Sequence, residues 1–321
     1  MNINISGVIG LSILINKKKN KKIFIFYDDH NNKKYCKGPD NDNKLFISKF
    51  CEQLINKYKN NVILILEEPF IEKNDNIKVL WENTKHLYLF RNFYTKLIDI
   101  CSNDKICYGF PTDIRLAIVD FTFDKSYLNE NTNDTNYQIT VSKYFNKILF
   151  IFDLDKLDEE YYDSEIIKFI KKVFSHFINS KYYINLKNKI NKFYNVFLIN
   201  NINKTLFEIL NMHVESYKFK KGYPFNESTD STENDVEYNF FDEFDNILSA
   251  IMEFYMTIII TTNSKNIKLV YAGYYHSLNI KFILNKYYGY DIIYENGITD
   301  NIEYINESKI KNCISIDKSI I

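Results

Sequence analysis

Ionisable side chains follow several apolar segments of this sequence, at the points where predicted strands end. Four such clusters occur: Asp28-Asp29-His30 after Ile23–Tyr27, Glu67-Glu68 after Val62–Leu66, Asp113 and Arg115 after Ile106–Phe110, and His276 after Ile267–Tyr271. In an open, mostly parallel sheet, ligands bind outside the carboxyl ends of the strands. Unpaired charges are costly to bury, so we expect these groups to share one rim of the sheet. A rim with two histidines and several carboxylates can bind a metal ion or run acid–base chemistry.

The first two clusters each allow a structural and a functional interpretation. His30 is either a plain loop histidine or a functional group, and the adjacent Asp28 and Asp29 favour the second. The reason is that a carboxylate can orient an imidazole through its second ring nitrogen. Glu67 and Glu68 are either a pair at a helix N-terminus, favoured by the helix dipole, or a divergent pair with one member in the site.

The most specific motif is Gly273-Tyr274-Tyr275-His276, directly after an apolar segment. A glycine at this point allows a tight turn or a close approach of the backbone. His276 then falls in the first turn of the next helix. That position favours the neutral imidazole, which binds metals and accepts protons.

Three further polar residues lie on predicted elements near this rim. His86 falls in the predicted helix Ile77–Ile100 and is either a structural histidine or a substrate-binding group. Asp113 and Arg115 are either a structural ion pair or part of the site. Asp29, Asp113 and His86 are therefore candidates for substrate binding.

Hydrophobic periodicity predicts an α/β fold with a mainly parallel central sheet, flanked by helices on both faces. The apolar runs Ile5–Ile15 and Ile23–Tyr27 predict a hairpin, with the basic segment Lys17–Lys22 as its turn. We predict one domain, residues 1–321, with a helical insertion at 142–220 and a C-terminal appendage at 297–321. The predicted helices are about Leu45–Tyr58, Ile77–Ile100, Phe240–Ile260 and Ser277–Lys286, and the last strand is Tyr290–Tyr294.

Composition excludes several classes of protein. Lys plus Arg equals Asp plus Glu at 41 each, without the basic surplus that nucleic-acid binding requires, so no nucleic-acid partner is expected. The five cysteines are odd in number, irregularly spaced and without a CxxC pair, so we expect free thiols and a reducing, cytoplasmic location. The apolar segment Ile3–Ile15 is shorter than the roughly 20 residues that span a bilayer, and no membrane association is expected.

Taken together, the strand–GxxH–helix unit, the earlier polar turn Tyr27-Asp-Asp-His30 and the glutamate after the second strand resemble the superfamily of Tiki and TraB/PrgY proteins. Erythromycin esterases, ChaN-type haem-binding proteins and a domain of the Pasteurella mitogenic toxin are grouped with it. The segment Phe244–Tyr290 also resembles proteins of giant DNA viruses of amoebae, and the composition, rich in Lys, Asn, Ile and Tyr, suits such a source. The first motif departs from GxxH because it has no glycine.

This resemblance implies a hydrolase in which His30 and His276 are metal ligands or acid–base groups, and Glu67 or Glu68 is a ligand or general base. Arg115 would bind an anionic group of the substrate or intermediate. The metal set would be His30, His276 and Glu67, holding a divalent zinc, manganese or cobalt ion. The substrate would be a small molecule or peptide. The alternative is a non-catalytic viral or host-interaction protein, in the host cytoplasm or the virion, that retains the fold. In it, Tyr274 or Tyr275 would block the site, and an apolar patch would be exposed elsewhere.

Overall fold

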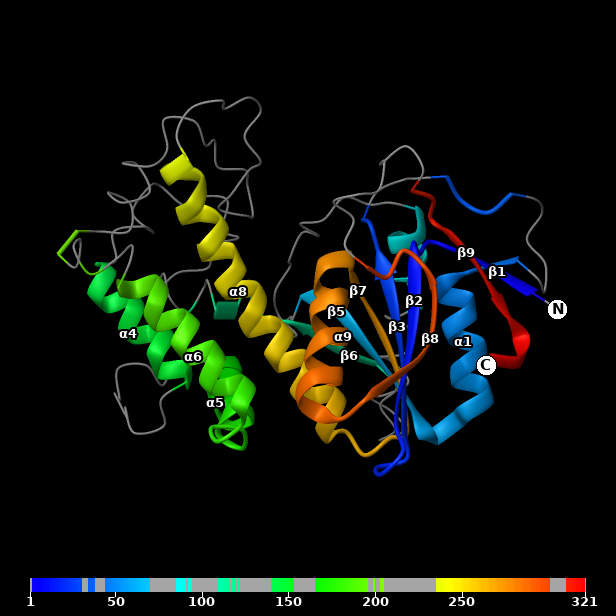
Figure 1. The fold of residues 1–321 in the computed structure, drawn as a ribbon, viewed down its shortest axis with the longest axis horizontal. Helices are drawn as coiled ribbons and strands as arrows, with labels where there is room; N and C mark the ends of the chain where they lie inside the picture. Colours follow the sequence, from blue (N-terminus) through cyan, green and yellow to red (C-terminus); the bar gives the residue numbers. More distant parts are fainter. Residues whose placement is uncertain are drawn as a thin grey trace. The chain divides into compact units, whose positions relative to one another are not determined.

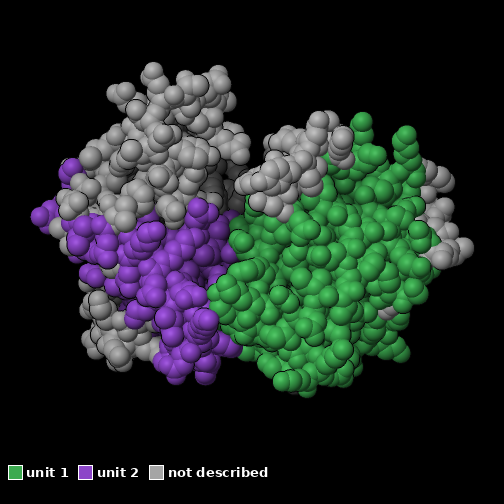
Figure 2. Space-filling view, viewed as in Figure 1, with its two compact units in different colours: residues 1–68, 81–112, 256–321 green, residues 69–80, 113–255 purple. Residues whose placement is uncertain are grey.

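The computed structural model describes residues 2–30, 34–37, 44–69, 85–90, 92–93, 109–115, 117–118, 121, 140–152, 165–195, 199, 203–204, 235–300 and 310–320, and all statements below concern these residues. The chain divides into two compact units, coloured separately in Figure 2. Unit 1 comprises residues 1–68, 81–112 and 256–321, and unit 2 comprises residues 69–80 and 113–255. Unit 2 therefore contains the helical insertion that we predicted at 142–220 and extends beyond it on both sides.

Unit 1 is built on a six-stranded sheet with the order β6-β5-β7-β3-β2-β8. Its strands are β2 (Gly10–Asn16), β3 (Lys21–Asp28), β5 (Val62–Pro69), β6 (Gly109–Asp113), β7 (Ile267–Gly273) and β8 (Asp291–Gly297). All four strands that carry the predicted polar clusters belong to this sheet. Both β3 and β5 run parallel to β7, so the ends of these three strands meet at one edge.

The prediction of a mainly parallel sheet is confirmed only in part, because the sheet is mixed. The hairpin that we predicted forms between β2 and β3, and β8 then pairs antiparallel with β2 (Figure 1). A hairpin requires antiparallel neighbours, so β2 runs against the central three strands, whereas β8, antiparallel to β2, runs in the same direction as they do. Sequence periodicity gives no direction for the edge strand β8, which follows α9.

Helices of the described chain are α1 (Ile47–Tyr58), α4 (Val141–Phe152), α5 (Glu165–Ser175), α6 (Lys181–Phe193), α8 (Asp235–Thr262) and α9 (Tyr274–Tyr288), with short 3-10 turns η1 (Lys59–Asn61) and η8 (Lys318–Ile320). The predicted helix at Ile77–Ile100 is described only at residues 85–90 and 92–93, which are helical. Most of the segment from 194 to 234 lies outside the described residues.

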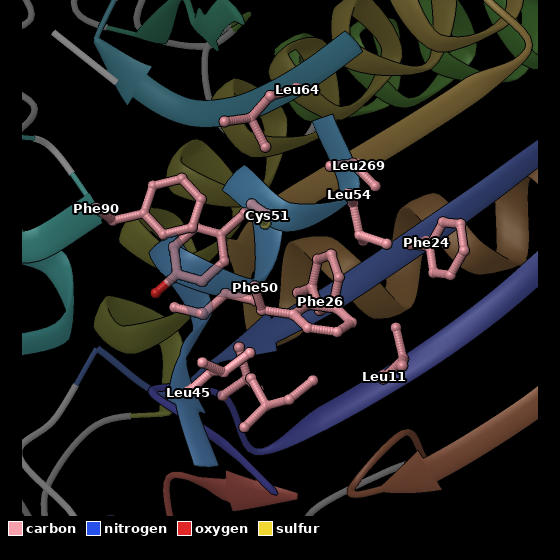
Figure 3. Close-up of a cluster of buried hydrophobic side chains, with 14 of the residues drawn as sticks. Leu11, Phe24, Phe26, Leu45, Phe50, Cys51, Leu54, Leu64, Phe90 and Leu269 are labelled. Carbon is pink, nitrogen blue, oxygen red and sulfur yellow. The ribbon is translucent and has the colours of Figure 1, made fainter. Parts of the chain in front are cut away.

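Alternate side chains of the central strands enter two separate apolar clusters. In β3, Phe24 and Phe26 join one cluster with α1, whereas Ile23, Ile25 and Tyr27 join the other with α9 and the end of α8. Figure 3 shows the first cluster, in which Phe26 meets Phe50 of α1 edge to face at 6.0 Å. Because both faces of the sheet are covered, a charged side chain of these strands can reach solvent or a polar partner only at the strand ends. The candidate site lies at those ends.

A second, three-stranded sheet joins the two ends of the chain. Its order is β4-β1-β9, with β1 at Asn2–Ser6, β4 at Lys44–Phe46 and β9 at Cys313–Asp317. The predicted apolar run Ile5–Ile15 is therefore two strands in different sheets. Gly7 breaks it with a φ of 95°, where a Cβ would lie 2.6 Å from the Cβ of His86. Part of the predicted C-terminal appendage, β9, is built into this sheet.

Cys36 and Cys313 form a disulfide, which corrects the prediction of free thiols. Their sequence separation of 277 residues hides the pair from any spacing argument. Strand β9 pairs with β1, and the backbone N–H of Cys36 donates to Ser6 Oγ in β1, which brings the two cysteines together. Cys51 is free and buried, and burial raises the pKa of its thiol.

Cys313→Ser is expected to lower the free energy of unfolding by about 2–5 kcal/mol, because the disulfide closes a long loop and restricts the unfolded chain. Urea denaturation monitored by circular dichroism measures the difference. Wild-type protein kept in dithiothreitol serves as the control and should unfold with the variant. Finding five free thiols in the untreated native protein would contradict the pairing.

Unit 2, considered by itself, is helical over most of its described residues. Phe254 of α8 is fully buried, and around its ring lie Phe174, Phe177, Tyr182 and Tyr183 from the α5–α6 hairpin. Helices α4 and α5 pack together in the same unit. In the described part of the chain, every helix is too short or too polar to cross a membrane.

Candidate functional site

The Asp28 carboxylate, at the end of β3, is the most completely bonded group of the candidate site. Its side chain is fully buried, and it accepts hydrogen bonds from two imidazoles, His30 Nδ1 at 2.9 Å and His86 Nε2 at 2.8 Å. Burial alone would raise the pKa of Asp28, but the hydrogen bonds and charge of the two histidines outweigh it and hold this pKa well below its usual value. Asp28 is therefore an ionised, fixed acceptor.

The backbone at His30 folds its ring back onto Asp28. His30 has a φ of 54°, in the left-handed region, and its backbone N–H donates to Asp28 Oδ1 at 3.0 Å. A non-glycine residue in this conformation costs about 1–2 kcal/mol. The two hydrogen bonds to Asp28 offset that cost and direct Nε2 of His30 away from the strand.

Glu67 of β5 lies between the two histidines that we predicted to converge. Its Oε2 atom is 4.0 Å from His30 Nε2, and its Oε1 atom is 3.4 Å from His276 Nε2. Its side chain is only 6 % exposed, compared with 15 % for His276 and 48 % for His30. The structure thus brings together three ionisable groups from β5, the β3 turn and α9.

Gly273 ends β7 and allows this close approach. Its backbone N–H donates to Glu67 Oε2 at 2.6 Å. A Cβ at this position would lie 2.6 Å from His30 Nε2 and 3.2 Å from Glu67 Oε2. The φ of Gly273 is −53°, so its glycine is required by space and not by backbone conformation. Helix α9 begins at the next residue and places His276 in its first turn, as the motif predicted.

Glu67 and Glu68 lie within strand β5 and not at a helix N-terminus, so successive side chains point to opposite faces. Glu67 contacts both histidines. Glu68 lies on the other face, where burial and the charges of Asp28 and Glu68 raise the pKa of Tyr271 well above its usual value. Glu67 thus reaches both His30 and His276, and strand alternation directs Glu68 to the other face.

Two side chains next to His276 fix the start of α9. Ser277 is buried, and its hydroxyl donates to the carbonyls of Phe26 at 3.2 Å and Ala272 at 3.0 Å. Tyr274 is also buried, with its hydroxyl donating to the carbonyl of Asp300 and its ring 6.0 Å from that of Tyr27. Tyr274 therefore packs into the core instead of filling the space beside the histidines.

The remaining predicted site residues have different surroundings. His86 is fully buried and bonded at both ring nitrogens, to Asp28 and to Tyr35, so it has a structural position and not a substrate-facing one. Asp29 is half-buried beside His30. Asp113 and Arg115 form a buried ion pair at 2.9 Å in unit 2 and are described there by themselves. The central position of Asp28, the partner Tyr35 and the contact of Gly273 with Glu67 were missed.

Gly273→Ala is expected to push the His30 ring away from Glu67 while the fold persists. The backbone conformation suits alanine, but the new Cβ overlaps His30 Nε2, the far end of a half-exposed side chain. We expect the midpoint of thermal unfolding to change by only a few degrees (~1 kcal/mol), and the His30 ring signals in an NMR spectrum to shift. A His30 environment identical to the wild type would contradict the geometry.

The donor types of this site suit a divalent metal. Two imidazole nitrogens and a carboxylate are ligands of zinc, manganese and cobalt. Asp28 accepts a hydrogen bond from Nδ1 of His30, as a carboxylate commonly does from a metal-bound histidine. Within the described residues, however, no three His, Cys, Asp or Glu side chains are spaced to hold an ion as they stand. The 4.0 Å separation of His30 from Glu67 is the long one, and the half-exposed ring of His30 is the group that would have to move.

Comparisons with known proteins leave the family undetermined: no family model, no curated protein and no solved structure matches the chain.

Proposed function

We propose that the chain is a hydrolase that activates water with His30, Glu67 and His276. The observation that supports this most is the position of the Glu67 carboxylate. It is fixed by the Gly273 N–H and lies between the Nε2 atoms of two histidines from separate elements. Such a convergence at the carboxyl ends of parallel strands is typical of ligand sites in α/β proteins. The proposal includes membership in the Tiki–TraB–erythromycin esterase superfamily, and with it a mainly parallel core of the sheet.

Each group has a role that its surroundings suit. The Nδ1–H group of His30 donates a hydrogen bond to Asp28, so the lone pair of His30 is on Nε2. Nε2 can therefore accept a proton from water as the attacking oxygen bonds to a carbonyl carbon. The bond to the leaving group then breaks, and His276, which enters this step as an imidazolium paired with Glu67, donates the proton that the leaving group requires. The proton taken from water by His30 then returns to His276. Glu67 orients both imidazoles and stabilises the positive charge on whichever of them is protonated. In the alternative in which His30, Glu67 and His276 hold a divalent metal, the ion would lower the pKa of water toward ~7, and the two histidines would be ligands instead of acid–base groups.

The substrate that this proposal implies is an ester, lactone or amide in a small molecule or peptide. His30 is the most exposed of the three groups, so substrate would approach from its side.

A non-catalytic interaction protein was the alternative, and its expected features were a tyrosine that blocks the site and an exposed apolar patch elsewhere. Tyr274 does not have that position, because it is buried in the cluster that contains Tyr27 and α9. Tyr275 is 64 % exposed. The buried position of Tyr274 supports the hydrolase proposal.

Hydrolysis of a panel of probes tests the proposal: p-nitrophenyl acetate, a simple lactone and a short peptide. The purified chain is expected to hydrolyse at least one probe faster than buffer. A parallel sample treated with EDTA, and then supplied with zinc, manganese or cobalt, shows whether activity needs a metal. If no probe is hydrolysed in any arm, the interaction protein becomes the better account.

A further inference from the structure

A chain of hydrogen bonds continues behind His30 into the interior of unit 1. The Tyr35 hydroxyl lies 3.0 Å from His86 Nδ1, and His86 Nε2 lies 2.8 Å from Asp28 Oδ1. Asp28 Oδ2 then lies 2.9 Å from His30 Nδ1. The side chains of Asp28 and His86 are fully buried. His86 takes no direct part in the water chemistry proposed above, so its two hydrogen bonds need a separate explanation.

The donors and acceptors of this chain have one consistent direction. Both oxygens of the Asp28 carboxylate face nitrogen partners, the two imidazoles and the backbone N–H of His30, and a carboxylate in this setting acts as an acceptor. His30 must therefore donate through Nδ1, and His86 must donate through Nε2. A neutral His86 then has its lone pair on Nδ1 and accepts from the Tyr35 hydroxyl. The consequence is that His30 keeps its lone pair on Nε2, the nitrogen that faces Glu67.

Tyr35, the outer end of this chain of hydrogen bonds, is also fixed in position. Tyr35 precedes Cys36, which is bonded to Cys313 and donates its backbone N–H to Ser6 Oγ. The Tyr35 ring lies 5.6 Å from the ring of Phe46. These contacts tie Tyr35 to the three-stranded sheet, so its hydroxyl is held toward His86.

We propose that His86 and Tyr35 are positioning residues, which fix the Asp28 carboxylate and thereby hold His30 in the tautomer with a proton on Nδ1. Two separate acceptors on Asp28 make this effective, since His86 occupies Oδ1 and leaves Oδ2 to the His30 ring. The kinetic consequence rests on the proposed hydrolase. The tautomer itself is a property of the protein alone and is measured without any substrate.

Nitrogen NMR of the full chain labelled with 15N-histidine tests the proposal, at a pH of about 8, where free imidazole is neutral. In the wild type, the Nδ1–H tautomer of His30 should exceed the other by about tenfold or more, as expected for a hydrogen bond to a charged group. His86→Gln should retain this excess, because the amide can still donate to Asp28. His86→Leu should reduce it to a mixture.

Tyr35→Phe keeps the test decisive if His86→Leu fails to fold, since Tyr35 is half-buried and phenylalanine fills the same space. In this variant His86 loses its donor at Nδ1 while Asp28 still accepts from Nε2, so the tautomer should persist and the Nδ1 signal of His86 should shift. Unchanged His86 signals in Tyr35→Phe, or a wild-type His30 that is already a mixture, would overturn the proposal.

Kinetics separate this proposal from the proposed function. If a probe is hydrolysed, His86→Leu should lower kcat and leave KM nearly unchanged, while His86→Gln restores most of kcat. If no probe is hydrolysed but the tautomers respond as described, the positioning role is supported and the hydrolase proposal fails.

Discussion

Asp28→Asn is expected to lower the free energy of unfolding by about 3 kcal/mol at neutral pH. The native carboxylate is fully buried. It accepts hydrogen bonds from two imidazoles and from the backbone N–H of His30. An asparagine has one oxygen and one NH₂ group, so one imidazole N–H would face another donor. Breaking one partner of a buried charged network typically costs this much. Urea denaturation measures the difference.

The pH dependence gives this prediction a second, independent signature. The pKa of Asp28 is lower in the folded chain than in the unfolded one, so its contribution is fully present above the unfolded pKa of about 4. It is lost as the pH falls further toward the folded pKa. The groups that face Asp28 are His30, His86 and Tyr271. The difference in unfolding free energy between wild type and variant should therefore shrink below about pH 4.

Asp291→Asn is the matched control, because Asp291 is exposed on the edge strand β8. It should change the unfolding free energy by no more than about 0.5 kcal/mol at any pH. An Asp28→Asn variant as stable as this control at neutral pH would show that the buried network contributes nothing.

His276→Ala is expected to reduce the rate of probe hydrolysis by about 10²- to 10⁴-fold, the usual contribution of a positioned acid or base. His276 lies 3.4 Å from Glu67 and is the group assigned to protonate the leaving group. It is in the first turn of α9 and belongs to neither apolar cluster, so its removal leaves both clusters intact. The measurement is kcat/KM for the most rapidly hydrolysed probe.

Tyr275→Ala provides the control for this substitution, since Tyr275 is the preceding residue of α9 and is 64 % exposed. Its rate should stay within about threefold of the wild type (~0.6 kcal/mol). Equal rates for His276→Ala and Tyr275→Ala would remove His276 from the reaction.

The sequence predicted the edge of the sheet at which the site lies. Charged residues that end apolar strands cannot be buried between the covering helices, so they gather at the strand ends. Periodicity placed β3, β5 and β7, and the glycine followed by His276 placed the start of α9. Strand alternation also contained a signal that was overlooked: Asp28 continues the inward-facing series of Phe24 and Phe26. That position required buried partners.

Features that depend on contacts between distant segments were not predictable. The bond from His86 to Asp28 spans 58 residues and the disulfide spans 277, and neither leaves a mark on local spacing. The antiparallel direction of β8 follows from its pairing with β2 and not from its own residues. Gly7 divides the first apolar run. Its conformation and its contact with His86 depend on the tertiary structure, so the sequence pattern did not predict the break.

The paired substitutions Glu67→Gln and Glu68→Gln provide the most direct test that Glu67 serves a catalytic site. The two residues are adjacent in β5, carry the same charge and lie on opposite faces of the strand, so changes of net charge cancel in the comparison. The measured quantity is the rate of probe hydrolysis by each variant relative to wild type. The account predicts a loss of about 100-fold or more for Glu67→Gln and a rate within about threefold of wild type for Glu68→Gln. Equal rates for the two variants would contradict it.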